Sequence, residues 1–202
     1  MTNARVYKSP LREAQAAQTR ERILEAARSF LEANDIDGLT LRRAAELAQV
    51  SPPTVYAHFP TLDDLMAAFF QWLSPRIGMD EPLPPLAELP GMPARLFALY
   101  EANGALLRKL MDSPSWDRRR LAGRDRRIGA WIEAIGAELP HLAADERRRG
   151  GLAVASCWSP THWRWLTDTG GLTQADAVAS ASWTIRTLIQ ALKQGLPPED
   201  RP

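Results

Sequence analysis

The 202-residue chain is 45% hydrophobic and 24% charged, with a formal net charge of +1 at pH 7. That length allows one large or two small domains, and the near-neutral charge excludes a protein that binds polyanions through total charge alone. The single cysteine, Cys157, excludes an intrachain disulfide, and no run approaches the roughly 18 apolar residues that cross a bilayer. Residues 1–15 lack the apolar stretch of a secretion signal, so we expect a soluble cytoplasmic protein.

Apolar residues recur at intervals of three and four along the chain, which predicts an all-α protein of about nine helices. The first helix is predicted over 19–34, and Ser9-Pro10 would allow an earlier start. Three short helices follow, with Thr40, Ser51 and Thr61 as their N-caps. The inward residues of the second helix are predicted to be Leu41, Ala44, Ala45, Leu47 and Ala48.

A change of composition marks the middle of the chain. Residues 75–93 contain six prolines and two glycines, which indicates a loop or boundary. We therefore predict an N-terminal domain over 1–73, a Pro-rich loop over 74–92 and a C-terminal domain over 93–202. Within the last domain, helices are expected near 93–112, 116–138, 143–167 and 173–194.

The segment from Thr40 to Phe59 has the features of a helix-turn-helix. Two short capped helices are joined by a tight turn, AQVS, and the second helix of such a unit enters the DNA major groove. Its polar side chains suit phosphate oxygens and base edges, with Thr54 the best polar group for reading a base. The predicted DNA-binding residues are Thr40, Arg42, Arg43, Ser51, Pro52, Pro53, Thr54, Tyr56 and His58. The two prolines offer only apolar contacts, such as those to thymine methyl groups.

An arm before the first helix adds basic residues without acidic ones. Arg5, Lys8 and Arg12 are expected to contact the phosphate backbone. The competing interpretation is that the polar groups of the short helices only cap a small structural bundle.

Residues 19–72 resemble the N-terminal domain of the tetracycline-repressor (TetR) family of bacterial regulators. The resemblance is carried by TRERILEAARSFLEANDIDGLTLRRAAELAQVS, TVYAHF and TLDDLM. It implies DNA contacts by Thr40, Arg42, Ser51, Thr54, Tyr56 and His58. It also implies a homodimer that places two such helices in successive major grooves of a double-stranded operator. A small-molecule effector in the C-terminal domain would lower DNA affinity.

Three positions depart from the family pattern. Gln49 replaces a common glycine in the turn, which costs on the order of 1 kcal/mol if the residue needs a positive φ. Pro53 stands at another frequent glycine, and Leu62 replaces a common lysine that would contact phosphate.

The C-terminal residues resemble the family only in outline. THWRWLTDTGGLT and ADAVASASWTIRTLIQAL are similar to its last two helices, which usually form the dimer interface. The predicted dimer face contains Ala177, Ala181, Thr184, Ile185, Leu188, Ile189 and Leu192; the alternative is that it packs within its own subunit. Phe97, Trp131 and Trp163 are predicted to line the effector pocket, because such cavities are mainly apolar and aromatic.

An enzyme is the hypothesis from another class. Ser156, Cys157, His162 and Asp168 are close in sequence, but residues 157, 162 and 168 share no helical face. The three histidines are isolated and no glycine-rich phosphate loop occurs, so we expect no catalytic residue, metal or cofactor. A helical small-molecule-binding protein with a degenerate DNA-binding head remains the alternative to a regulator.

Overall fold

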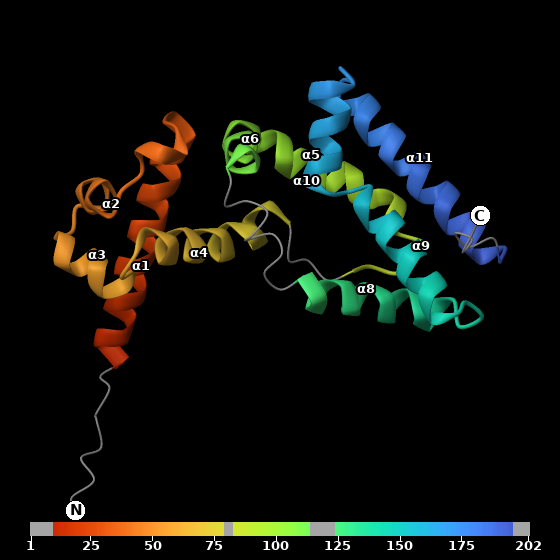
Figure 1. Cartoon of the computed structure of the whole chain (residues 1–202), viewed down its shortest axis with the longest axis horizontal. Coiled ribbons are helices and arrows are strands. Elements are labelled where there is room, and N and C mark those ends of the chain that lie inside the picture. Colours follow the sequence, from red (N-terminus) through yellow and green to blue (C-terminus); the bar gives the residue numbers. More distant parts are fainter. Residues whose placement is uncertain (1–9, 79–82, 114–123, 196–202) are drawn as a thin grey trace, which may run out of the picture. The chain divides into compact units, whose positions relative to one another are not determined.

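The computed structural model describes residues 10–78, 83–113 and 124–195, and within these ranges it contains ten α-helices and no strand (Figure 1). The predicted all-α class is therefore confirmed, with one helix more than the nine or so expected. The chain divides into two compact units between Leu73 and Ser74, called here the N-terminal and the C-terminal unit. None of the described helices combines the length and apolar character needed to cross a membrane.

Four helices form the N-terminal unit: α1 (Pro10–Ala33), α2 (Leu41–Ala48), α3 (Pro52–His58) and α4 (Leu62–Leu73). α1 begins at Pro10, where a missing N–H removes no intrahelical bond. Both α2 and α4 pack against α1, and the Trp72 indole of α4 donates to Glu21 of α1 at 2.7 Å. The buried stripe of α1 consists of Ile23, Leu24, Ala26, Ala27, Phe30 and Leu31.

Hydroxyl side chains start the short helices, as predicted. The Thr40 hydroxyl accepts a hydrogen bond from the amide of Arg43 at 3.1 Å, and the Ser51 hydroxyl accepts one from the amide of Thr54 at 3.3 Å. Each bond satisfies a backbone donor that the first turn of a helix leaves without a partner. The bounds of α2 and α3 therefore follow from local sequence.

α4 begins with a reciprocal capping box. The amide of Asp64 donates to the Thr61 hydroxyl at 3.1 Å, and the amide of Thr61 donates to the Asp64 carboxylate at 3.0 Å. Two backbone donors are satisfied in this way, which fixes the residue at which α4 starts.

One residue predicted to face inward from α2 does not do so. Leu47 is 41% exposed, whereas Leu41, Ala44, Ala45 and Ala48 are buried. At 100° per residue, Leu47 lies about 120° from the centre of the buried face. The prediction that Leu47 faces inward is therefore wrong, because its apolar type favours the core while its helical angle places it outside.

The C-terminal unit contains six α-helices and three shorter helical turns among the residues described. In chain order they are η2 (Ser74–Ile77), η3 (Leu89–Gly91), α5 (Met92–Ala102), α6 (Gly104–Asp112), α8 (Arg124–Glu138), α9 (Ala144–Ser156), α10 (Pro160–Arg164), the π-helical turn η4 (Trp165–Thr169) and α11 (Gln174–Lys193). The segment expected as a Pro-rich loop thus includes two 3-10 turns.

Two helices expected as single segments are each divided in the structure. The segment 93–112 breaks at Asn103, whose side-chain amide donates to the carbonyl of Leu99 at 2.8 Å. The segment 143–167 breaks at Ser159-Pro160, where the serine hydroxyl caps α10 and the proline takes its first position. Ser159-Pro160 is an N-cap sequence, which the periodicity of apolar residues does not reveal. Residues 116–123, expected as the start of another helix, lie outside the described residues.

α11 packs along η3, α5 and α9, and its path beside α5 and α9 is visible in Figure 1. One face of α11 is buried within its own unit. Five of the seven residues of the predicted dimer face belong to that buried side: Ala177, Ala181, Ile185, Ile189 and Leu192. These residues meet their own chain and leave little surface for a second copy. The exposed side of α11 carries Trp183 instead, which is 64% exposed.

Candidate nucleic-acid interface

The turn between α2 and α3 depends on one residue in the left-handed helical region. Gln49 has φ 53° and ψ 46°, and among the described residues it is the only non-glycine with a positive φ. Its amide donates to the carbonyl of Glu46, and the amide of Val50 donates to that of Ala45, both at 3.1 Å. These bonds form a Schellman-type end to α2, a position where glycine is usual. Gln49 therefore has the positive φ that glycine adopts more readily, at a cost on the order of 1 kcal/mol.

Ser51 and Thr54 together leave one hydroxyl donor available at the start of α3. Their side-chain oxygens are 2.7 Å apart, so one hydroxyl donates to the other. Whichever residue donates, the hydrogen of the remaining hydroxyl is free to reach a phosphate or base acceptor. Ser51 is exposed and Thr54 is half-buried. The pair thus supplies a single donor fixed at the helix N-terminus.

Tyr56 and His58 lie on the outer side of α3, next to a buried anchor. Tyr56 is 50% exposed and His58 is half-buried. Phe59 is only 1% exposed, and the guanidinium carbon of Arg20 lies 4.5 Å from its ring centroid. The anchored phenyl ring therefore orients α3 while the phenol of Tyr56 points into solvent.

The N-terminus of α2 carries a second polar group. Thr40, Arg42 and Arg43 are all exposed there. Arg43 is paired with Glu46 at 2.9 Å, an exposed contact of little energetic weight that a phosphate would readily displace. For Arg42 the described residues provide no ion-pair partner. Two exposed cations thus accompany the amides that a helix N-terminus directs outward.

Pro52 and Pro53 are both exposed and occupy the first two positions of α3. No intrahelical partner exists for a backbone N–H there, so the prolines cost the helix no hydrogen bond. With the exposed Ala57 they give α3 a small apolar surface beside its polar groups. All nine predicted DNA-binding residues thus lie at the N-terminus of α2, in the turn or on α3. Of the predicted basic arm, Arg12 is exposed on α1, whereas Arg5 and Lys8 lie outside the described residues.

The three residues predicted to line a ligand pocket do not lie together. Phe97 and Trp163 are completely buried and connected through Tyr100, with ring centroids 6.0 and 5.9 Å from the tyrosine. They form part of the core. Trp131 lines a separate cavity and meets Trp158 edge-on, with ring centroids 6.3 Å apart.

That cavity lies between α8, α9 and a segment of residues 83–89, which we call the strap. The strap residues and the acidic group that holds them were not identified from the sequence, since Leu and Pro in a loop carry no sign of what they cover. The amide of Leu86 donates to the Glu138 carboxylate at 2.8 Å. The lining residues are Leu83, Pro84, Leu86, Leu89, Trp131, Ala134, Ile135, Glu138, Gly151, Ala155 and Trp158.

The residues considered for catalysis have other partners. The Ser156 hydroxyl and the Cys157 thiol both donate to the carbonyl of Ala153, at 2.7 and 3.4 Å. Burial raises the pKa of Cys157 and lowers that of His162, so the thiol stays protonated and unreactive. Asp168 is held by Arg108 at 2.6 Å, and that hydrogen bond lowers its pKa. Among the described residues, no three side chains of metal-ligand type gather into a site.

Comparison with known proteins gives one family match. The model of bacterial regulatory proteins of the tetR family matches residues 23–69, which span the buried stripe of α1, both short helices and most of α4. No curated protein matches the chain.

Two solved structures are similar over most of the chain. A Rhodococcus sp. protein assigned to the TetR family of transcriptional regulators has a TM-score of 0.59 at 17% identity, covering 85% of this chain and 98% of its own. NalD from Pseudomonas aeruginosa, the secondary repressor of the MexAB-OprM multidrug efflux pump, has a TM-score of 0.55 at 17% identity, covering 93% and 100%. At this identity the likeness describes a shared fold.

Proposed function

Because the chain belongs to the TetR family of DNA-binding transcriptional regulators, we propose that α3 enters the major groove of an operator while the N-terminus of α2 meets the phosphate backbone. We propose further that the protein acts in the cytoplasm as a repressor. The repressor direction is supported by the similarity to NalD, which is a repressor of an efflux pump.

The observation that carries this proposal is the exposed phenol of Tyr56 on a helix of seven residues. Leaving half of a tyrosine ring in water gives up burial that would help so small a unit to fold. The phenol hydroxyl would donate a hydrogen bond to a phosphate oxygen, which would account for its exposure. The same DNA strand would be contacted by the free hydroxyl donor of the Ser51–Thr54 pair and by the arginines of α2.

Base reading by α3 would be largely apolar. Pro52, Pro53 and Ala57 have no side-chain donor and would contact thymine methyl groups. Thr54 is half-buried and its hydroxyl is hydrogen-bonded to that of Ser51, so it offers at most one polar base contact. Sequence preference would then come from a few methyl contacts together with DNA shape.

We propose a homodimer formed through the last two helical elements, with the exposed side of α11 in place of the face predicted from sequence. Trp183 and Trp165 are 64% and 58% exposed, the two most exposed tryptophans among the described residues. Thr187 lies one turn after Trp183 on the same exposed side. Aromatic side chains of this kind dominate the energetics of protein interfaces, which supports a second copy as the partner.

The effector is proposed to bind in the cavity under the strap. Its lining is apolar except for Glu138, and Trp131 and Trp158 present two rings at right angles. This favours a small molecule with an aromatic ring and a single hydrogen-bond donor. The open space is only about 10 Å³, close to the least that one water needs, so we propose that the strap moves when a ligand enters.

Movement of the strap would connect ligand binding to the rest of the C-terminal unit. η3 continues from the strap into α5, and both pack on α11, the proposed dimer helix. A ligand that binds one arrangement of η3, α5 and α11 more tightly than another would increase the fraction of dimers with that arrangement. DNA release follows if the favoured dimers hold the two α3 helices away from the spacing of about 34–36 Å that fits one helical turn.

The DNA-binding part is tested by selecting duplexes from a random pool with the purified full chain. We expect enrichment of a palindromic sequence with half-site centres about one helical turn, or a multiple of it, apart. Enrichment of single half-sites alone would contradict the dimer. Absence of any enriched sequence would favour the alternative, a helical small-molecule-binding protein with a degenerate DNA-binding head.

The effector part is tested with the neutral fluorescent probe N-phenyl-1-naphthylamine. Ala155 lines the cavity, and Ala155→Leu should fill it and weaken probe binding about tenfold. Ala153→Leu on the same helix is the matched control, since Ala153 is outside the lining. Equal loss in both variants, or probe that binds without releasing the selected duplex, would contradict the site.

A further inference from the structure

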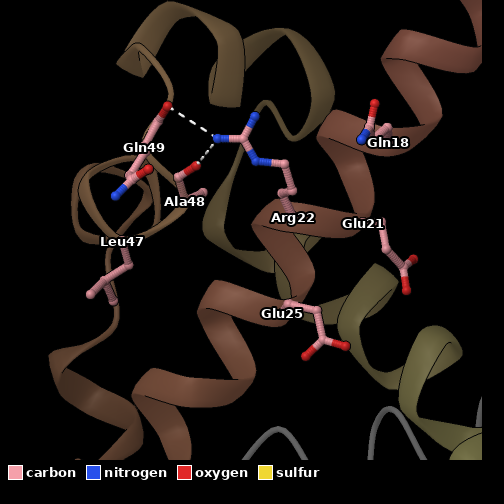
Figure 2. A pocket seen from close by; sticks show the side chains of 7 residues that line it. All are labelled: Gln18, Glu21, Arg22, Glu25, Leu47, Ala48 and Gln49. Carbon is pink, nitrogen blue, oxygen red and sulfur yellow. Dashed lines mark hydrogen bonds between the residues drawn. The ribbon is translucent and has the colours of Figure 1, made fainter.

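The unfavourable turn at Gln49 receives support from a residue far away in the sequence. Nη2 of Arg22, on α1, donates to the carbonyl oxygen of Ala48 at 2.6 Å and to that of Gln49 at 3.3 Å (Figure 2). The bonds join positions 26 and 27 residues apart. They therefore fix the end of α2 to α1 and do not belong to either helix's own bonding.

These bonds act where α2 most needs a partner. The last carbonyls of a helix have no intrahelical donor, and the negative end of the helix dipole favours a cation there. A guanidinium supplies both the donor and the charge, in a charge-assisted bond stronger than one between neutral groups. The carbonyl of Gln49 also belongs to the residue with positive φ. Arg22 thus stabilises the one conformation in which α3 follows α2 at this angle.

We propose that Arg22 is a positioning residue, which sets the orientation of α3 by holding the carbonyls of Ala48 and Gln49 and so compensates for the absence of glycine in the turn. Its effect on DNA binding rests on the proposed function. Its effect on the turn itself does not, and can be measured without DNA.

The surroundings of Arg22 argue against a direct phosphate contact. Glu21 and Glu25 line the same surface recess as Arg22, together with the exposed Leu47 (Figure 2). Glu21 additionally accepts a hydrogen bond from Trp72. Two carboxylates and an apolar side chain form a surface that a polyanion would avoid. Arg22 is thus expected to affect DNA affinity through the turn.

The first experiment measures amide hydrogen exchange of Val50 and Thr54 in the free protein. Arg22→Met should speed exchange at both amides about fivefold, the equilibrium change expected when a left-handed residue loses its support. In the Gln49→Gly background the same substitution should change exchange less than about twofold, because glycine adopts this conformation unaided. Arg28→Met is the matched control, since Arg28 also lies on α1 and pairs with Glu32 of the same helix at 2.8 Å. Equal effects in both backgrounds, or no effect, would overturn the proposal.

The second experiment repeats this cycle for affinity to the selected duplex, at temperatures well below unfolding. Arg22→Met should weaken binding about fivefold with an unchanged slope of log affinity against log salt, and Gln49→Gly should restore most of the loss. A slope lower by about 0.9 would instead identify a phosphate contact and overturn the positioning role. If the wild-type chain binds no duplex, the proposed function fails while the exchange cycle still decides the role of Arg22. Arg22→Lys provides a milder variant, with an intermediate result expected, should Arg22→Met prove poorly folded.

Discussion

The two units are both helical, yet their helix ends are determined differently. In the N-terminal unit, α2, α3 and α4 each begin at a hydroxyl residue that caps a backbone amide three residues later. In the C-terminal unit, α10 and α11 also begin after a capping hydroxyl, Ser159 and Thr173. By contrast, only the Glu146 carboxylate closes the cap before α9, and α5 and α6 begin without a side-chain cap. Local sequence therefore specifies the start of each short helix in the proposed reading unit, but of only some helices in the proposed effector unit.

The largest expected effect removes the anchor of α3. Phe59→Ala takes away a ring that is 1% exposed, and loss of a buried phenyl group costs about 3–5 kcal/mol. We expect the N-terminal unit to unfold at lower denaturant and DNA binding to disappear. Leu62→Ala, in the same unit but 38% exposed, should cost less than about 1 kcal/mol. Similar losses from both changes would show that this unit is not organised around Phe59.

A charge on the exposed side of α11 should separate the proposed dimer. Trp183→Asp removes an interface aromatic, for which losses of about 2 kcal/mol or more are typical, equivalent to about thirtyfold weaker association. Sedimentation of the variant should give a monomer at concentrations where the parent chain is a dimer. Leu11→Asp alters another highly exposed apolar residue, on α1, and should leave the association unchanged. A parent chain that is itself monomeric would contradict the dimer.

Loss of the Tyr56 hydroxyl should weaken DNA binding by about tenfold, the value of one hydrogen bond to a charged acceptor. Tyr56→Phe should do so equally on the selected duplex and on unrelated duplexes, because a phosphate contact carries no sequence information. Thr54→Ala should in addition reduce the preference for the selected duplex. Tyr100→Phe is the control, since its hydroxyl donates to Trp158 within the C-terminal unit at 3.1 Å. The role assignment is wrong if Tyr56→Phe and Thr54→Ala reduce the preference equally.

The smallest expected effect is a pH dependence in the C-terminal unit. Burial lowers the pKa of His162 below its usual value of about 6.5. Below that pH the unfolded chain binds more protons than the native one, so stability falls as the pH drops from about 6.5 towards the native pKa. His162→Gln should flatten the melting temperature between pH 7 and 5. An unchanged slope would show that the imidazole is equally protonated in both states.

Sequence reasoning was most successful where the structure is locally determined. The caps at Thr40, Ser51 and Thr61 needed only their neighbours, whereas a positive φ at Gln49 was suggested, as a condition, by the glycine common in the resembling family. Arg22 was missed because nothing near it indicates a contact with carbonyls 26 and 27 residues away.

The C-terminal unit was predicted less well for the same reason. The type of Ala177 and Ile185 suited a dimer face, but which side of α11 is covered by its own chain depends on α5 and α9. Likewise Phe97 and Trp163 have the composition of a pocket wall and form core instead. Of the three predicted pocket residues, only Trp131 lines the cavity, and the strap that covers the cavity belongs to a loop.

The central claim is that the N-terminal unit binds duplex DNA through the phosphates of the DNA. Affinity for the selected duplex should be measured between 50 and 200 mM salt. If each α2–α3 pair makes three or four phosphate contacts, the dimer should lose about 10³-fold or more in affinity over this range. An affinity that stays constant across the range, or no measurable binding at 50 mM, would contradict the account.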